Sequence, residues 1–384
     1  MPHSHISWPL LLALLVFPQI VETAYSPALV DIATAFEVLP EVAGQTLAIY
    51  FAGFAAGVLV WGMACDRIGR RRSMLAGLGC YMAGVSMALV SNDFFDLMCA
   101  RALAAFGAAA GSIVTQTLLR DHFHGQALSL AFARAGMALA VSPAIGAGAG
   151  AILAGMFGHR GVFIFLAVLA AVLLVWTLRE LPRDTPPVTS STARMSGLVL
   201  RMAGDARIRA ASVAIALWNL QLFGFYEVAP FVLQGLDMPV SAMGWSGAAL
   251  AAGAMGGATL NRRLLTRGWP PERLLLMAAA LDSLGYLPMV ASPDSIRSLF
   301  GMPLVAAAFA IAIPQILGSV LGDYASCRGS AGAVLGVSYY LLLALGLSLF
   351  GWAPSMPVAM GTTIAATLLA SKLYQRAAYT RVAA

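Results

Sequence analysis

Runs of apolar residues, each about 20 residues in length, recur along the whole chain and alternate with short polar segments. A helix of about 20 apolar residues crosses the hydrocarbon core of a bilayer, because each residue adds about 1.5 Å. Glycine and proline interrupt several runs, as membrane helices tolerate. The pattern predicts an all-α polytopic membrane protein with twelve transmembrane helices, at residues 8–35, 44–64, 73–90, 96–118, 127–155, 159–179, 207–233, 241–261, 273–291, 298–320, 330–350 and 354–373.

Composition indicates that lipid is the main solvent of the chain. Hydrophobic residues make up 60% of its 384 residues and charged residues only 10%, and the mean hydropathy is +0.83. A soluble domain carries about 25% charged residues. The net charge of +6 does not indicate a nucleic-acid partner, because the basic residues lie in short clusters between the apolar runs. Lipid headgroups are the natural neighbours of such clusters, so we expect membrane lipids as partners and no nucleic acid.

The distribution of basic residues predicts the orientation of the spans. If the N-terminus is cytoplasmic, nearly all arginines and the single lysine fall in cytoplasmic segments, and only Arg160 and Arg297 fall on the other side. This is the bias that cytoplasmic loops show. The first apolar run lacks the basic segment and cleavage site of a signal peptide, so we interpret it as the first span. We expect a multi-pass protein of the bacterial inner membrane with both termini in the cytoplasm.

The longest polar stretch lies near the middle of the chain. It predicts an N-terminal six-helix bundle over residues 1–180, a cytoplasmic linker over 181–206 and a C-terminal six-helix bundle over 207–384. Parallel repeats of this kind are known in secondary transporters.

Two features suggest that the halves are pseudo-symmetric. Gly62 and Asp66 at the end of the second span are echoed by Gly257 and Asn261 at the end of the eighth, an offset of 195 residues. At the same offset, Asp31 has a counterpart within one residue in the acid of the seventh span.

The loop after the second span, residues 62–72, reads GMACDRIGRRR. Its order, spacing and location resemble the cytoplasmic loop signature of the major facilitator superfamily. A glycine there permits close helix approach, and the aspartate can pair with arginines or a helix N-terminus. The resemblance implies a conformational latch; the alternative is that the arginines are only orientation charges. The latch residues would be Gly62, Asp66, Arg67, Gly69, Arg70 and Arg71.

The fourth span, RALAAFGAAAG at residues 101–111, resembles the corresponding motif of the superfamily's drug:proton antiporters, especially the Bcr/CflA group. Ala104 stands where that group usually has glutamine. The segment from Tyr25 to Leu29 in the first span also resembles the group, with the usual acid displaced to Glu22.

The fifth span carries a proline and glycines that resemble an element associated with exporters. Ser142 and Ala147 stand in place of glycines of that element. The resemblance assigns a helix-packing role to Ser142, Pro143 and Gly146, and it implies a transporter that exports a small molecule.

Ionisable residues inside a membrane are costly and usually mark a cavity or a partner. Glu22 and Arg101 both fall in the outer half of the bilayer, so we expect them to lie close together. Burial favours the neutral acid whereas a guanidinium favours the carboxylate, so proton affinity would follow conformation. The alternative is a static structural pair. Asp31, further out, is either a second proton-coupling group or the solvated end of the first span.

Further polar residues are candidates for the substrate cavity, each with a structural alternative. The neutral amides can instead join helices, Glu227 can be interfacial, and Arg134 can extend to headgroups. Asp282 is expected to make a helix–helix hydrogen bond. Tyr25 and Tyr226 are included because they neighbour acids. The predicted cavity residues are Tyr25, Gln116, Arg134, Asn219, Gln221, Tyr226, Glu227 and Gln315.

The sequence contains no nucleotide-binding signature, catalytic constellation or Cys-x-x-Cys pair, so we expect no enzyme activity, metal or cofactor. A proton gradient would supply the energy. The predicted function is a proton-coupled exporter of a drug-like compound or self-made metabolite, and we expect the protein to function as a monomer. A dedicated siderophore exporter and an importer or facilitator of the same fold remain alternatives.

Overall fold

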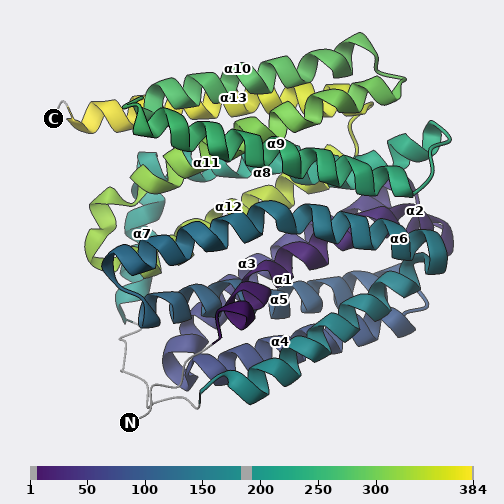
Figure 1. The fold of residues 1–384 in the computed structure, drawn as a ribbon, viewed down its shortest axis with the longest axis horizontal. Coiled ribbons are helices and arrows are strands. Elements are labelled where there is room, and N and C mark those ends of the chain that lie inside the picture. Colours follow the sequence, from purple (N-terminus) through teal and green to yellow (C-terminus); the bar gives the residue numbers. More distant parts are fainter. Residues whose placement is uncertain (1–6, 183–192, 383–384) are drawn as a thin grey trace. The chain divides into compact units, whose positions relative to one another are not determined.

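The computed structural model describes residues 7–182 and 193–382, which form helices and contain no strand (Figure 1). The elements of the first half are α1 (Trp8–Tyr25), η1 (Ser26–Ala28), α2 (Leu29–Ala35), α3 (Pro40–Ile68), α4 (Arg70–Val90), α5 (Phe94–His122) and α6 (Gly125–Glu180). Those of the second half are α7 (Ala193–Gly204), α8 (Ala206–Gly235), α9 (Ser241–Thr266), α10 (Pro271–Ala291), η2 (Ile296–Gly301), α11 (Met302–Val320), η3 (Gly322–Cys327), α12 (Arg328–Phe350) and α13 (Met356–Val382).

The twelve predicted spans correspond to these helices. Ten stretches are long and apolar enough to cross a membrane among the described residues, and one of them, Leu130–Glu180, is far longer than a single span. Its helix α6 breaks at Gly158, where φ is 63° and ψ is −165°, a conformation that glycine adopts without a Cβ penalty. The break separates the spans predicted at 127–155 and 159–179. Helix α9, which is not among the ten, completes the predicted twelve.

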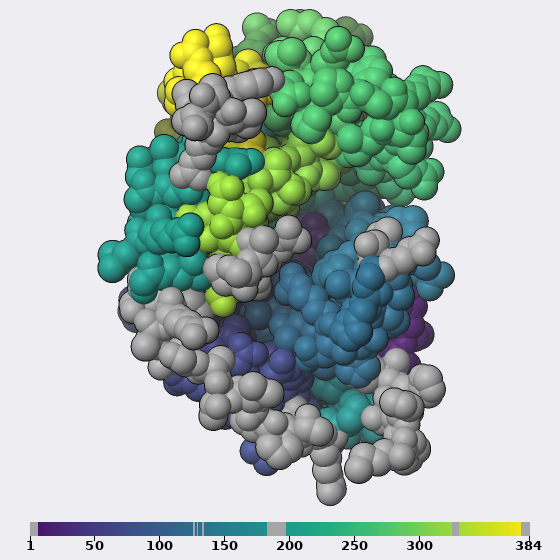
Figure 2. All heavy atoms as spheres, turned by 90° about the vertical axis from the view of Figure 1, so that its left-hand side faces the viewer, coloured from purple at the N-terminus to yellow at the C-terminus, as the bar shows by residue number. Residues whose placement is uncertain are grey.

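The chain folds into two compact units, Met1–Ser191 and Thr192–Ala384. In the space-filling view, each unit is a body of closely packed atoms drawn from its own range of the sequence (Figure 2). Unit 1 contains α1 to α6 and unit 2 contains α7 to α13. Part of the predicted linker 181–206 is helical, since α7 lies within it. Met202 of α7 is buried in the unit 2 core whereas Leu200 is 75% exposed.

Equivalent helix pairs pack through equivalent glycines in the two units. In unit 1, α3 packs on α5, and a Cβ on Gly57 would overlap the carbonyl oxygen of Phe106. In unit 2, α9 packs on α11, and a Cβ on Gly257 would overlap the carbonyl oxygen of Ala307. Small residues allow such close backbone approach in membrane helices. Gly57 and Gly257 are therefore structural counterparts, 200 residues apart.

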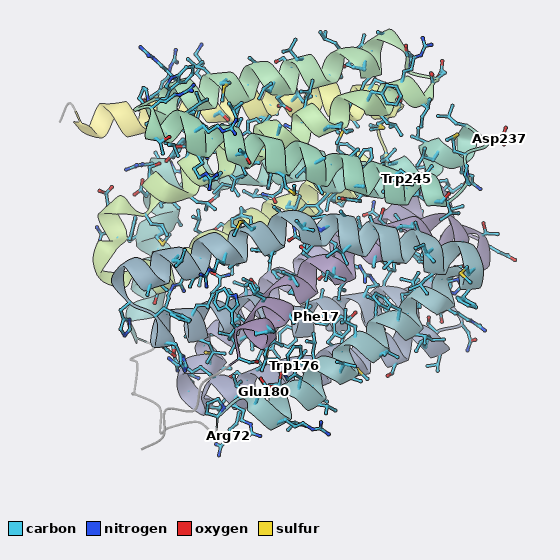
Figure 3. All side chains as sticks on the ribbon, viewed as in Figure 1. Phe17, Arg72, Trp176, Glu180, Asp237 and Trp245 are labelled. Atoms are coloured by element: carbon cyan, nitrogen blue, oxygen red, sulfur yellow. The ribbon has the colours of Figure 1, made fainter. Side chains whose placement is uncertain are left out.

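The turns after the first predicted membrane span of each unit, 8–35 and 207–233, give the same offset of 200 residues. Glu37 follows α2 and Asp237 follows α8, and both have φ of 53°, a rare value for residues other than glycine. Asp237 is labelled in Figure 3 at the turn beyond α8.

The predicted offset of 195 residues is therefore wrong. The motif echo pairs Gly62 with Gly257, but packing pairs Gly257 with Gly57. At an offset of 200, Asp31 corresponds to Phe231, so the acids of the first and seventh spans are not equivalent. The two units share a backbone template but place their charged side chains at different positions.

Candidate functional site

A buried charged group lies inside unit 1, between α1, α3 and α5. Glu22 is only 4% exposed and Arg101 only 3%. The guanidinium carbon of Arg101 lies 3.7 Å from the ring centroid of Tyr25 and 4.8 Å from that of Tyr50. Both rings therefore contact the cation through their faces, an interaction that strengthens on desolvation.

Glu22 and Arg101 interact through space rather than by a direct ion pair. Arg101 is within electrostatic range of Glu22, but no salt bridge within 4.0 Å joins them among the described residues. Glu22 Oε1 and Arg101 Nε and Nη2 are buried without a hydrogen-bond partner. The tyrosine rings contact the guanidinium, and no short ion pair ties the carboxyl group of Glu22 to it.

Close packing of α1 places this group. Gly111 of α5 lies against α1, where a Cβ would come within 2.8 Å of the Leu14 carbonyl oxygen. The hydroxyl of Tyr50 on α3 donates to the carbonyl of Pro18 at 3.0 Å. Pro18 lies inside α1, so the helix lacks one backbone N–H donor there. Tyr50 of α3 contacts α1 at this residue.

The predicted packing residues of the fifth span lie against the same helix. Ser142 on α6 places its hydroxyl 2.9 Å from Gln19 Oε1. A Cβ on Gly146 would come within 2.8 Å of the Ile20 carbonyl oxygen and would overlap the Thr23 side chain. Pro143 lies inside α6 beside them.

Asp31 lies outside the Glu22 group and holds the break in α6. Its Oδ2 accepts two hydrogen bonds of 2.6 Å from His159, one from the backbone N–H and one from Nδ1. A Cβ on Gly158 would come within 2.6 Å of the same oxygen. Phe36 and Phe163 pack against the His159 ring at centroid distances of 5.9 Å. The two alternatives given for Asp31, a second proton-coupling group or the solvated end of the first span, did not include this contact with His159.

The predicted latch forms a cluster where α3 meets α4. Arg70 contacts Asp66 at 3.4 Å and Asp121 of α5 at 2.9 Å, and it donates to the Cys65 carbonyl at 2.9 Å. Arg71 donates to the Leu178 carbonyl of α6 at 2.6 Å.

The two glycines of that motif differ in role. Gly69 separates α3 from α4 with φ of 95°. Gly62 does not permit close helix approach as predicted, because a Cβ there would meet only Ile113, at 3.8 Å. That function belongs to Gly57, one and a half turns earlier. Arg67 is exposed.

The predicted cavity residues of unit 2 divide into two sets. Glu227 and Tyr226 are buried on α8, and both carboxylate oxygens of Glu227 have no hydrogen-bond partner. By contrast, Gln315 donates to Asn261 Oδ1 at 2.9 Å and so joins α11 to α9. Gln221 joins α8 to α10 and α13, which is the structural alternative for such amides.

The remaining candidates make local contacts. Asn219 donates to the Ile215 carbonyl of its own helix at 2.8 Å, and Gln116 donates to Ser112 Oγ at 3.1 Å. Arg134 is exposed on α6. Their roles stay predictions.

Comparison with known proteins decides the family. The family model of the Major Facilitator Superfamily matches residues 11–347. The chain belongs to the major facilitator superfamily. Its relatives include an uncharacterized transporter of Rickettsia bellii, 27% identical over 354 residues and covering 87% of each chain. Multidrug resistance protein D of Escherichia coli K12 is 26% identical over 234 residues, 61% of this chain and 59% of that protein.

Solved structures of the superfamily share the fold. A bacterial homologue of the human lysosomal transporter Spinster, in an inward-facing and occupied conformation, has a TM-score of 0.74 at 16% identity, covering 97% of this chain and 96% of that one. A D-xylose–proton symporter has a TM-score of 0.72 at 15% identity, covering 95% and 97%. The predicted fold class and family are confirmed: the protein is a multi-pass membrane transporter and not an enzyme.

Within this superfamily fold, three contacts of the chain escaped the sequence analysis. Neither His159 nor Asp121 was assigned a role from the sequence, although His159 contacts Asp31 and Asp121 contacts Arg70. Asp282 was given an unspecified helix partner, which the structure identifies as Gln221. Only the glycine before His159 offered a signal, since it lies between two predicted spans.

Proposed function

We propose that the protein is a proton-coupled exporter of a small molecule, with Glu22 as the proton-binding group. The observation that carries the proposal is the buried Glu22 carboxyl group beside an Arg101 held by two tyrosine rings. An unpaired carboxylate in hydrocarbon costs several kcal/mol, so the neutral acid is favoured there. The nearby guanidinium favours the charged form, and small movements of α1 against α5 shift the balance.

Such a balance supports antiport. If one conformation keeps Glu22 close to Arg101 and the other separates them, the proton binds preferentially to the second. Substrate that prefers the opposite state then moves against the proton. Alternating access of the two units would expose the group to each side in turn, with no cofactor beyond the proton gradient and with a single chain as the working unit.

Charge distribution supports a location in a bacterial inner membrane. The basic loops, including the latch around Arg70, would lie in the cytoplasm with both termini. Contacts of Arg70 and Arg71 that join α3, α4, α5 and α6 would then stabilise one end state on that side.

The names of two relatives favour export of organic compounds. Multidrug resistance protein D and, at 21% identity over 336 residues, multidrug resistance protein MdtL both carry multidrug resistance in their names, which export of organic compounds would provide. Ala104, Ser142 and Ala147 depart from the motifs of drug:proton antiporters. These departures instead favour a dedicated substrate, such as a self-made siderophore. A metabolite importer is the further alternative.

Transport by the reconstituted protein tests the coupling. Proteoliposomes with an imposed pH gradient and ethidium as probe should show gradient-driven dye movement for wild type. Glu22→Gln mimics the protonated acid permanently, so its gradient-driven transport should fall to that of protein-free liposomes while its thermal stability is retained. Glu41→Gln, in the first turn of α3, is the matched control and should transport normally.

Each outcome has a meaning. Full gradient-driven transport by Glu22→Gln would overturn the assignment of the proton to Glu22. Absence of dye movement in wild type would overturn general drug export and leave the dedicated metabolite. Right-side-out and inverted vesicles distinguish export from import.

A further inference from the structure

Three polar side chains from three helices meet inside unit 2. They are Gln221 on α8, Asp282 on α10 and Thr367 on α13, and all are 0% exposed. Gln221 Nε2 donates to Asp282 Oδ2 at 3.2 Å and to Thr367 Oγ1 at 3.0 Å. Since none of these residues reaches lipid or solvent, every polar atom must find its partner inside the protein.

The hydrogen bonds set the direction of the amide. The Thr367 hydroxyl donates its hydrogen to the Thr363 carbonyl at 2.7 Å, so its oxygen is an acceptor towards Gln221. Gln221 Nε2 carries two hydrogens, and the two acceptors use both. A flipped amide would place its oxygen against an oxygen that has no hydrogen left to donate.

Two atoms of the cluster are left over. Gln221 Oε1 and Asp282 Oδ1 are buried without a hydrogen-bond partner. If Asp282 is ionised, both are acceptors and neither can satisfy the other. A carboxylate would then be buried with one neutral donor and, among the described residues, no salt bridge. Burying an unpaired charge is among the most costly arrangements in a membrane protein.

A single proton on Asp282 would give both unpartnered oxygens a hydrogen bond. Protonated Asp282 has one O–H donor, and Gln221 Oε1 is an acceptor on the same amide that already bonds the other carboxyl oxygen. A carboxylic acid and a primary amide can form two such bonds at once, N–H to acid carbonyl and acid O–H to amide carbonyl. The unsatisfied atoms are the two that this second bond would join.

We propose that Asp282 is a proton-binding site in unit 2, independent of Glu22 and occupied by a proton in this conformation. Loss of that proton would leave two buried acceptor oxygens without a donor and would weaken the contact of α8 with α10. Because α8 also carries Glu227, six residues beyond Gln221, occupancy of the site would influence the packing of the helix that bears a predicted cavity acid.

Neighbouring charges do not offer another counter-ion. Helix α11, which packs on α10, has no titratable residue. On α13, Lys372 is exposed, and on α10 the hydroxyl of Tyr286 donates to the Pro357 carbonyl at 3.0 Å. Glu227 on α8 is itself an acid. The chemistry that fits the cluster is therefore a proton.

Infrared spectroscopy of the purified full-length protein tests the site without a transport assay. Wild type should show the carbonyl stretch of buried protonated carboxyl groups, shifted in D₂O, and Asp282→Asn should lose one component of that absorption. Glu22→Gln should keep the component that Asp282→Asn loses, so failure of this proposal is distinguishable from failure of the proposed Glu22 coupling. Asp294→Asn, an exposed acid in the turn after α10, is the control and should leave the band unchanged.

Two further measurements keep the test decisive. If Asp282→Asn does not fold, Gln221→Leu should displace the band by removing its hydrogen-bond partner. An unchanged spectrum in both variants would overturn the proposal. A thermal stabilisation by Na⁺ that wild type shows and Asp282→Asn lacks would also overturn it, in favour of a monovalent cation held by the same oxygens.

Discussion

The two units use the same backbone contacts for different polar chemistry. In unit 1, the buried acid Glu22 has a buried cation, Arg101, whose guanidinium is held by two tyrosine rings. In unit 2, Glu227 has neither a salt bridge nor a hydrogen bond among the described residues, and Asp282 has only an amide. The repeat thus conserves how helices approach one another within each unit, and it leaves the positions of charge free to differ.

This comparison predicts that the glycine contacts tolerate least change. Gly57→Leu and Gly257→Leu would each drive a side chain into a backbone carbonyl of the facing helix, which cannot move away as a side chain can. Overpacking typically costs about 1–3 kcal/mol, and a rigid carbonyl places these sites at or above the upper end. Both variants should lose most of their monodisperse protein in detergent and melt at lower temperature.

Neighbouring glycines provide the controls. A Cβ on Gly256, beside Gly257, or on Gly79 of α4 would meet nothing within 4 Å. Gly256→Leu and Gly79→Leu should therefore melt close to wild type. If only one of Gly57→Leu and Gly257→Leu lost stability, the two glycine contacts would not be equivalent, because equivalent packing predicts a loss in both variants.

The sequence predicted the helices and their limits better than it predicted which face of each helix packs against its neighbours. Length and hydropathy alone placed the first span at 8–35 and the boundary between the fifth and sixth within residues 156–158, where the structure has the break at Gly158. The proximity of Glu22 to Arg101 was predicted from depth, since both were expected to lie in the same half of the bilayer. Span limits and depth depend only on position along the chain, so the order of apolar and polar residues is enough to predict them.

Contacts between faces were harder to predict. Gly62 was preferred over Gly57 because it belongs to a recognisable motif, although a membrane helix rich in small residues gives no periodic signal for its packed face. The same choice produced the wrong offset of 195. The partner of Asp282 required knowledge of which residues of α8 and α13 face α10, and helix α7 escaped because its residues read as a polar linker.

The charged group of unit 1 predicts an effect of intermediate size. Arg101→Lys keeps the positive charge but loses the planar guanidinium that lies over Tyr25 and Tyr50. A desolvated cation–π contact contributes about 2 kcal/mol, so the variant should be destabilised by about 1–2 kcal/mol. It should also lose gradient-driven transport, because the cation no longer has a fixed position relative to Glu22.

Thermal unfolding and dye transport would be measured together. Arg134→Lys, at an exposed arginine of α6, is the matched control and should behave as wild type in stability. Normal transport by Arg101→Lys would show that charge alone, without the tyrosine contacts, is sufficient, and the contrast between the two units would then reduce to the presence of one cation.

The smallest effect is expected at the ends of the first predicted membrane span of each unit. Asp31 accepts two hydrogen bonds from His159 and so holds the break in α6.

Asp237 lies in a turn, and its carboxylate makes no hydrogen bond to the described residues. Asparagine is tolerated at its positive φ. Asp31→Asn keeps an acceptor oxygen but loses its charge, so it should cost about 1 kcal/mol, the difference between a hydrogen bond to a charged group and one to a neutral group. Asp237→Asn should be neutral. Hydrogen exchange at the His159 amide reports the contact directly: faster exchange in Asp31→Asn alone is expected, and equal exchange in both variants would contradict a fastening role for Asp31.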